Sequence, residues 1–223
     1  MSEFTARAAG QRWTEAQKMK TEIIKIKGDW QDVVNDCRAT VGKGALGKEP
    51  SEAFKRSILL AEHSPIRNIS VKWRWSGIKS WIATHWSRHK WECYIRTQRD
   101  DRTGVDRDSL PQSAPVDFVG EANAQHLIDT WRKRLCHQAH PETRAYAVDF
   151  KAALREIEPE LSDALVPSCV YRGGCPEMRS CGLWQAFTRW CFEIQGLVPI
   201  EHLTLKDRYK LFNEYFYEKE IAK

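Results

Sequence analysis

The chain has 223 residues, a hydrophobic content of 42% and a formal net charge of +5. This composition supports a buried core and excludes an intrinsically disordered chain, and no stretch approaches the roughly 18 uninterrupted apolar residues of a membrane span. The first residues lack the apolar segment of a secretory signal peptide, and the seven cysteines are an odd number, so we expect a cytoplasmic protein with reduced thiols. The mildly basic charge suits an anionic small ligand, and is modest for a nucleic-acid groove.

Local patterns predict the elements in chain order. They give an N-terminal arm at 1–20, a strand at 21–27, a helix at 30–37, a glycine-rich loop at 41–49, a helix at 51–61, a strand at 68–75, a helix at 78–86, a strand at 91–97, a polar connection at 100–120, and helices at 121–136, 141–157, 183–195 and 205–218. Asp29 stands where a helix cap belongs, and Pro50 and Ser51 open the next helix. Residues 68–75 (NISVKWRW) alternate apolar and polar side chains, as a half-buried strand does.

These elements predict an α+β fold with a small antiparallel sheet packed against long helices. The composition changes after Pro159, where cysteines appear in a Gly/Pro-containing segment. We therefore divide the chain into the arm at 1–20, a main domain at 21–157 and a helical, cysteine-containing C-terminal extension at 158–223.

A basic cluster follows the helix predicted at 78–86. Arg88, His89 and Lys90 stand at the helix-to-strand junction, and three further arginines follow within fifteen residues. Arginine forks bind phosphate oxygens with two hydrogen bonds, so the cluster indicates a phosphate-bearing ligand. The alternative is a solvated basic surface.

The helix predicted at 121–136 carries two candidate binding side chains. Asn123 and Arg134 are eleven residues apart, close to three whole turns, so a helix through both presents them on one face. This face lies beside an apolar stripe and is suited to line a pocket. The alternative is an ordinary amphipathic helix.

Three blocks of sequence resemble the flavin-dependent thymidylate synthases, the ThyX family. The family signature reads Arg-His-Arg, seven residues and Ser-x-Arg; this chain reads Arg88-His89-Lys90, WECYIR and Thr97-Gln98-Arg99. Glu62-His63-Ser64-Pro65 fits the upstream context, and residues 122–144 look like the family's Asn-containing helix and its Arg-bearing end. The resemblance covers about residues 20–157.

The resemblance implies the reductive methylation of deoxyuridine monophosphate (dUMP) to dTMP. In that family methylenetetrahydrofolate supplies the carbon, NADPH the electrons and FAD the redox chemistry, and homotetramers share active sites between subunits. The residues implied to bind FAD are His63, Ser64, Arg88, His89, Lys90, Asn123 and Gln138. Those implied to bind dUMP are His85, Thr97, Gln98, Arg99 and Arg134, of which Arg134 is also implied to polarise the pyrimidine during catalysis.

The chain departs from the family pattern at several points. Lys90 replaces an arginine and supplies a point charge instead of a fork. The signature is one residue short, so either Thr97 or Gln98 takes the place of its serine. Two alternatives therefore stay open: another flavin-dependent C5 modification of a pyrimidine deoxynucleotide, such as hydroxymethylation, or a non-catalytic nucleotide- or nucleic-acid-binding protein on the same scaffold.

Three cysteines of the extension are regularly spaced. Cys169, Cys175 and Cys181 follow a C-x5-C-x5-C pattern, and Cys191 stands ten residues further on. Thiolates so spaced are candidate ligands of a structural zinc ion or an iron–sulfur cluster, with Cys136, His137 and His140 of the neighbouring helix as candidates for a further ligand. Free buried thiols and a redox disulfide are the alternatives, because pairing does not follow from spacing.

Overall fold

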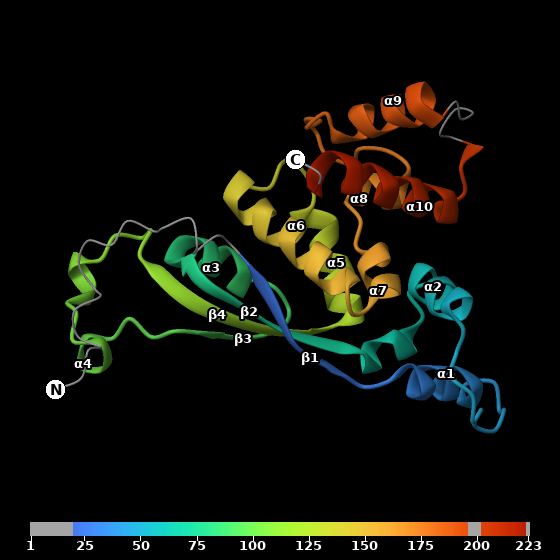
Figure 1. Ribbon diagram of the computed structural model, residues 1–223, viewed down its shortest axis with the longest axis horizontal. Coiled ribbons are helices and arrows are strands. Elements are labelled where there is room, and N and C mark those ends of the chain that lie inside the picture. Colours follow the sequence, from blue (N-terminus) through green and yellow to red (C-terminus); the bar gives the residue numbers. More distant parts are fainter. Residues whose placement is uncertain (1–19, 196–201, 222–223) are drawn as a thin grey trace.

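The computed structural model describes residues 20–195 and 202–221, so the arm expected at 1–20 lies outside it except for Lys20. The fold is α+β, as predicted, with a four-stranded antiparallel sheet in the order β1-β2-β4-β3 (Figure 1). The strands are β1 (Thr21–Lys27), β2 (Ser70–Lys79), β3 (Glu92–Ile95) and β4 (Pro115–Asn123). The α-helices are α1 (Trp30–Ala39), α2 (Glu52–Leu60), α3 (Ser80–Ser87), α4 (Asp100–Thr103), α5 (Ala124–Arg134), α6 (Pro141–Arg155), α7 (Pro159–Ala164), α8 (Ser168–Arg172), α9 (Leu183–Gln195) and α10 (Leu205–Phe216). Shorter turns are η2 (Ser64–Asn68), η3 (Arg107–Ser109) and the π-helical η5 (Tyr217–Ile221).

Several helices begin at the capping residues that the sequence marks. The Asp29 carboxylate accepts a hydrogen bond of 2.7 Å from a first-turn amide of α1, and the Ser51 hydroxyl does the same for α2. Each cap satisfies an amide that the helix itself leaves unpaired. No helix of the described residues has the length and apolar character needed to cross a membrane.

The polar connection predicted at 100–120 is wrong in its second half, which forms most of β4. This strand is central, because it pairs with β2 on one side and β3 on the other. Its inward positions include Gly120 and Ala122. Because these residues are small and have low strand propensity, the alternation of apolar and polar residues is not apparent in the sequence. Gly120 is required where it stands, because a Cβ atom there would overlap the ring of Trp73.

Two predicted element boundaries are also wrong. The strand expected to end at Ser76-Gly77 continues to Lys79 through an irregularity in its pairing with β4, so Ile78 is a strand residue and α3 begins at Ser80. The helix expected from residue 121 begins at Ala124 instead, because β4 runs on to Asn123.

Indole rings form the core between the sheet and the helices that cover it. Trp73, Trp75, Trp86 and Trp131 are completely buried, and they come from β2, α3 and α5. The Trp75 and Trp86 rings lie 4.8 Å apart, and those of Trp86 and Trp131 5.5 Å apart. Aromatic pairs of this kind add to the free energy of area burial. The core therefore fixes α3 against α5, and with them the side chains at their C-terminal ends.

A buried lysine joins the C-terminal helices to this core. Lys151 of α6 is completely buried, and its ammonium donates hydrogen bonds to the backbone carbonyl of Ser162 and, over 2.7 Å, to Oδ1 of Asn213. Burial lowers the pKa of Lys151 to about 7. One continuous hydrophobic cluster runs from the sheet to α10, and the sequence boundary at 157–158 stays a prediction.

Candidate functional site

Four of the predicted site residues meet where the C-terminal ends of α3 and α5 approach each other. We call this group, His85, Arg88, His89 and Arg134, the Arg134 cluster. Nε of Arg134 donates a hydrogen bond of 2.8 Å to Nε2 of His89, and a terminal nitrogen donates one of 3.1 Å to the backbone carbonyl of His85. The guanidinium lies 5.7 Å from the centre of the Trp86 ring. The aromatic core thus holds both partners of the cluster in place.

Both histidines of the cluster are held neutral. Burial, with the charges of Arg134 and Lys133, lowers the pKa of His89 to about 4. Because Nε2 of His89 accepts from Arg134, its ring proton is on Nδ1. Burial and the charges of Arg134 and Arg88 also lower the pKa of His85. The positive charge of the cluster therefore resides on its arginines.

Among the described residues, that positive charge has no acidic partner. Within residues 20–195 and 202–221, no carboxylate lies within ion-pair distance of Arg88, Arg134, Lys90 or Lys133. Burial and the Arg88 charge lower the pKa of Arg134 below its ordinary value. Arg132, by contrast, is paired with a carboxylate. A half-buried guanidinium without a counter-ion is stabilised by an anion or a polarised carbonyl group, so the cluster is built to receive one.

The end of the signature lies elsewhere on this chain. Thr97, Gln98 and Arg99 follow β3, which leads away from α5 toward α4 at the opposite end of the sheet (Figure 1). The Arg99 guanidinium binds both carboxylate oxygens of Asp101 at 2.7 and 2.8 Å, and the Thr97 hydroxyl accepts a hydrogen bond from the Arg99 amide. These residues do not join the Arg134 cluster within one chain.

Asn123 and Arg134 lie at opposite ends of α5, and the helix predicted to run through both begins one residue after Asn123. Their shared role in lining one pocket stays a prediction. Asn123 is the N-cap of α5, and its Oδ1 accepts a hydrogen bond of 2.9 Å from the amide of His126. The eleven residues of α5 separate the two side chains by roughly 16 Å along the axis. Asn123 thus has a capping role in this chain.

The other predicted flavin contacts are exposed and dispersed. His63 and Ser64 stand at the start of η2, which packs against α5, and neither side chain caps this turn. Gln138 follows α5, and its amide donates a hydrogen bond of 2.6 Å to the backbone carbonyl of Arg179. Lys90 is exposed beside the Arg134 cluster.

One residue that contacts the cluster has no signal in the sequence. Thr143 of α6 is completely buried, and its hydroxyl lies 3.2 Å from Nδ1 of His85. The two residues are 58 positions apart, so no local pattern links them. Glu62 belongs to the upstream motif and has no role assigned by the resemblance. Its carboxylate pairs with Arg132 and accepts a hydrogen bond from Gln125.

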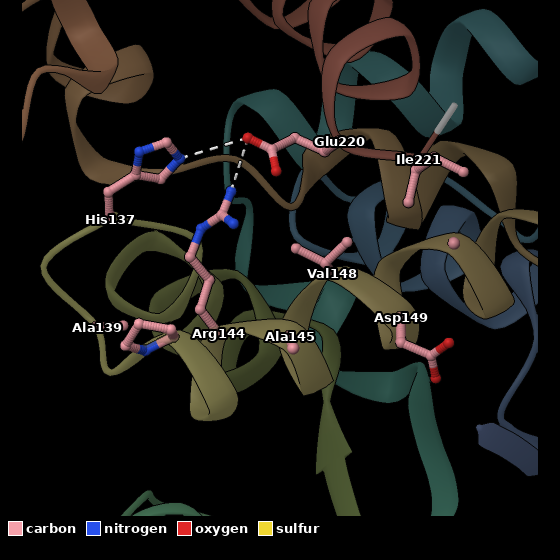
Figure 2. A pocket seen from close by; sticks show the side chains of 10 residues that line it. His137, Ala139, Arg144, Ala145, Val148, Asp149, Glu220 and Ile221 are labelled. Atoms are coloured by element: carbon pink, nitrogen blue, oxygen red, sulfur yellow. Dashed lines mark ion pairs between the residues drawn. The ribbon is translucent and has the colours of Figure 1, made fainter. Parts of the chain in front are cut away.

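A separate groove of about 740 Å³ lies between α6 and η5. Figure 2 shows His137 and Arg144 both directed at Glu220, at 3.4 and 3.0 Å. Burial would raise the pKa of Glu220, but the hydrogen bond from His137 and the Arg144 charge hold it below its ordinary value. Arg144 and Glu220 are paired with each other in this groove, and none of the residues implied to bind FAD or dUMP lines it.

The cysteines are all free thiols. Sγ of Cys136 lies 3.8 Å from Sγ of Cys181. In the described part of the chain, no three Cys, His, Asp or Glu side chains converge closely enough to hold a metal ion as they stand.

Comparison with known proteins finds similarity to the same family as the signature does, over a segment that follows the signature. The family model of the thymidylate synthase complementing proteins (Thy1) matches residues 105–160. A flavin-dependent thymidylate synthase from Clostridium tetani is 32% identical over 74 residues, which are 33% of this chain and 29% of that protein. The chain therefore aligns with less than a third of the length of this relative.

The fold has a solved counterpart. A UMP/dUMP methylase, PolB from Streptomyces cacaoi, crystallised with 5-Br dUMP, superposes with a TM-score of 0.53 and 15% identity over 66% of this chain and 93% of that one. At this identity the likeness concerns the fold alone. The chain is thus similar to the ThyX family in its signature residues and over residues 105–160, and it shares its fold with the methylase.

Proposed function

We propose that the protein is an FAD-dependent enzyme that methylates dUMP at C5, with methylenetetrahydrofolate as the carbon donor and NADPH as the reductant. The observation that carries the proposal is the half-buried Arg134 guanidinium, which has neutral partners on both sides and no acidic one among the described residues. The match to a flavin-dependent thymidylate synthase and the fold shared with a dUMP methylase support this reading of the site.

Arg134 acts on the pyrimidine in this proposal. Its two hydrogen bonds, to His89 and to the His85 carbonyl, fix the plane of the guanidinium and leave its remaining N–H groups free for a ligand. These groups stabilise the negative charge that develops on a pyrimidine carbonyl oxygen when an electron pair enters the ring. Neutral His89 serves as the acceptor that orients Arg134, a task that a protonated imidazole cannot perform.

The residues around the cluster fit a dinucleotide cofactor. Arg88 and Lys90 are exposed and have no carboxylate partner among the described residues, so they suit the diphosphate of FAD. FAD, when bound, supplies the redox chemistry of the reaction. The chain contributes charge for the phosphates, neutral histidines beside them, and an oriented guanidinium.

We further propose that the active enzyme is a homotetramer. The residues that the resemblance assigns to one flavin and nucleotide site lie in separate places on a single chain: the Arg134 cluster, the start of η2, and the segment after β3. A site that uses all three groups needs more than one copy of the chain. This dispersal supports a shared active site.

The test is turnover by the purified protein reconstituted with FAD. The reaction contains dUMP, methylenetetrahydrofolate and NADPH, and mass spectrometry of the nucleotide distinguishes a methyl product from a hydroxymethyl one. Arg134→Gln should lower kcat by about 100-fold or more. Arg189→Gln is the matched control, because Arg189 is an exposed cation of α9 outside the site, and it should leave the rate unchanged.

Two results would contradict the proposal. A folded protein that retains no flavin after desalting removes the redox chemistry altogether. Full activity of Arg134→Gln would remove Arg134 from the site and leave the enzyme class intact. Sedimentation of the FAD-bound protein tests the tetramer separately, and an active monomer would refute it.

A further inference from the structure

The cysteine pair Cys136 and Cys181 joins two parts of the chain that are 45 residues apart. Cys136 lies in the connection after α5, and Cys181 precedes α9. Their sulfur atoms are 3.8 Å apart, close enough for one thiol to donate a hydrogen bond to the other. The described residues include all seven cysteines, and no second pair of sulfur atoms among them is in such contact. These two thiols are therefore placed to react with each other.

Hydrogen bonds hold the two segments that carry this contact. The Gln138 side chain donates one of 2.6 Å to the Arg179 carbonyl and ties the connection after α5 to the segment before α9. On either side of Cys181, the Gly182 amide donates to the Ser180 hydroxyl over 3.2 Å. A disulfide has an S–S bond of about 2.0 Å, so closing the contact takes side-chain rotation and a shift of less than about 2 Å.

We propose that Cys136 and Cys181 form a reversible disulfide, with a small-molecule disulfide, represented by oxidised glutathione, as the oxidant. The Cys181 thiolate attacks one sulfur atom of the oxidant, forms a mixed disulfide and releases one glutathione. Cys136 then loses its proton, attacks Sγ of Cys181 and releases the second glutathione. The two cysteines lose two electrons to the oxidant, and their two protons end on the two glutathione thiols.

The order of the two attacks follows from the surroundings of Cys136. Burial raises the pKa of Cys136 to about 11, and the neighbouring Cys181 adds to the shift. Because the thiolate is the attacking species, Cys136 is a poor first nucleophile at neutral pH. Its contact with Cys181 makes it effective in the second step, which is intramolecular.

The disulfide would fasten the C-terminal helices to the end of α5. Cys136 is two residues beyond Arg134, and the loop closed by the disulfide contains α6, α7 and α8. A cross-link over a loop of this length stabilises the folded chain chiefly by restricting the unfolded one. The oxidised protein is therefore the more stable form.

The experiment is a peptide map of the whole protein, alkylated after incubation with oxidised glutathione or with dithiothreitol. Trypsin puts the four cysteines of this region into four different peptides, at 135–144, 156–172, 173–179 and 180–189. Mass spectrometry therefore identifies which cysteines are paired. Peptides 135–144 and 180–189 should be linked after oxidation and separate after reduction. Oxidation should also raise the melting temperature reversibly, by roughly 5–15 °C.

Two variants separate the steps of the reaction. Cys136→Ser should retain glutathione on Cys181, because the thiol that displaces it is missing. Cys181→Ser should retain almost none on Cys136, because Cys136 is a poor first nucleophile. Neither variant should show the rise in melting temperature. Cys93→Ser is the matched control, because Cys93 is a half-buried free thiol on β3, and it should form the disulfide as wild type does.

Three outcomes would overturn the proposal. In the first, oxidised wild type contains no linked peptides. In the second, Cys136 or Cys181 is linked mainly to Cys169 or Cys175. In the third, Cys93→Ser loses the link as Cys136→Ser does. The first two concern wild type, so they do not depend on the folding of a variant. None of these measurements involves flavin or dUMP, so this proposal and the proposed function fail independently.

Discussion

Replacing Lys151 by Met should remove a pH dependence of stability that this residue causes. The lysine is completely buried, and its ammonium is held by uncharged oxygen atoms. Burial lowers its pKa from 10.5 to about 7, with Asp163 opposing and Arg155 adding to the effect, and the rings of Phe216 and Tyr217 lie 5.3 and 5.8 Å away. A methionine side chain is unbranched and of similar length, and it carries no titrating group.

The sign and size follow from proton linkage. Between pH 7 and 10.5 the unfolded chain holds a proton on Lys151 that the folded chain has lost, so the free energy of unfolding rises with pH, by up to about 1.4 kcal/mol per pH unit. Integrated from pH 7 to 8.5, the rise is about 1.5 kcal/mol. The buried thiols Cys136 and Cys169 have the opposite effect and lower the free energy of unfolding as pH rises. They do so only at higher pH, because their pKa values lie above the ordinary 9.0.

Urea unfolding followed by tryptophan fluorescence at pH 7 and at pH 8.5 measures this difference. Wild type should gain about 1.5 kcal/mol at the higher pH, and Lys151→Met should gain none, although it is less stable at both pH values because Ser162 and Asn213 lose their donor. Lys25→Met is the control, since Lys25 is exposed on β1, and it should behave as wild type does. An equal gain in Lys151→Met would refute the reasoning.

Three further predictions concern the core and the site. Gly120→Ala should lower the free energy of unfolding in urea by about 1–3 kcal/mol, because its Cβ overlaps the Trp73 ring; an unchanged value would contradict the packing. Glu62→Gln should lower the free energy of unfolding by about 1–3 kcal/mol in a thermal melt, because the half-buried Arg132 guanidinium then keeps only the more exposed Asp129 carboxylate, at 3.4 Å, as a counter-ion. NMR titration of His89 should give a pKa of about 4 that moves toward 6.5 in Arg134→Gln. The His89 contribution to the free energy of unfolding should therefore decline as pH falls from 6.5 to 4 and stay constant below pH 4. An unshifted His89 pKa in the variant would contradict the effect of the Arg134 charge on His89.

Local chemistry predicted much of the fold. Capping by Asp29 and Ser51 and the alternation of residues 68–75 identify elements that the structure confirms. β4 was missed because Gly120 and Ala122 fill its inward positions, and small side chains are inconspicuous in an apolar pattern. The Trp73 ring occupies the space beside Gly120 and comes from 47 positions earlier in the chain. The need for glycine at this position therefore cannot be inferred from the local sequence.

The site was predictable in its residue types and less so in its geometry. His85, His89 and Arg134 do meet, but the packing of α3 on α5 brings them together, and no periodicity of either helix expresses that contact. The helix predicted from residue 121 begins only after Asn123, because this residue caps α5. An asparagine before an apolar helix is as typical of a cap as of a ligand contact.

The recognisable family stretch ends at residue 160, inside α7. Lys151 lies before that point, and both acceptors of its ammonium, Ser162 and Asn213, lie after it. A fragment cut at the edge of sequence similarity would keep Lys151 and lose both acceptors, together with the Phe216 and Tyr217 rings that lie over the ammonium. The stretch that resembles the family therefore does not contain all the partners that its own core lysine uses.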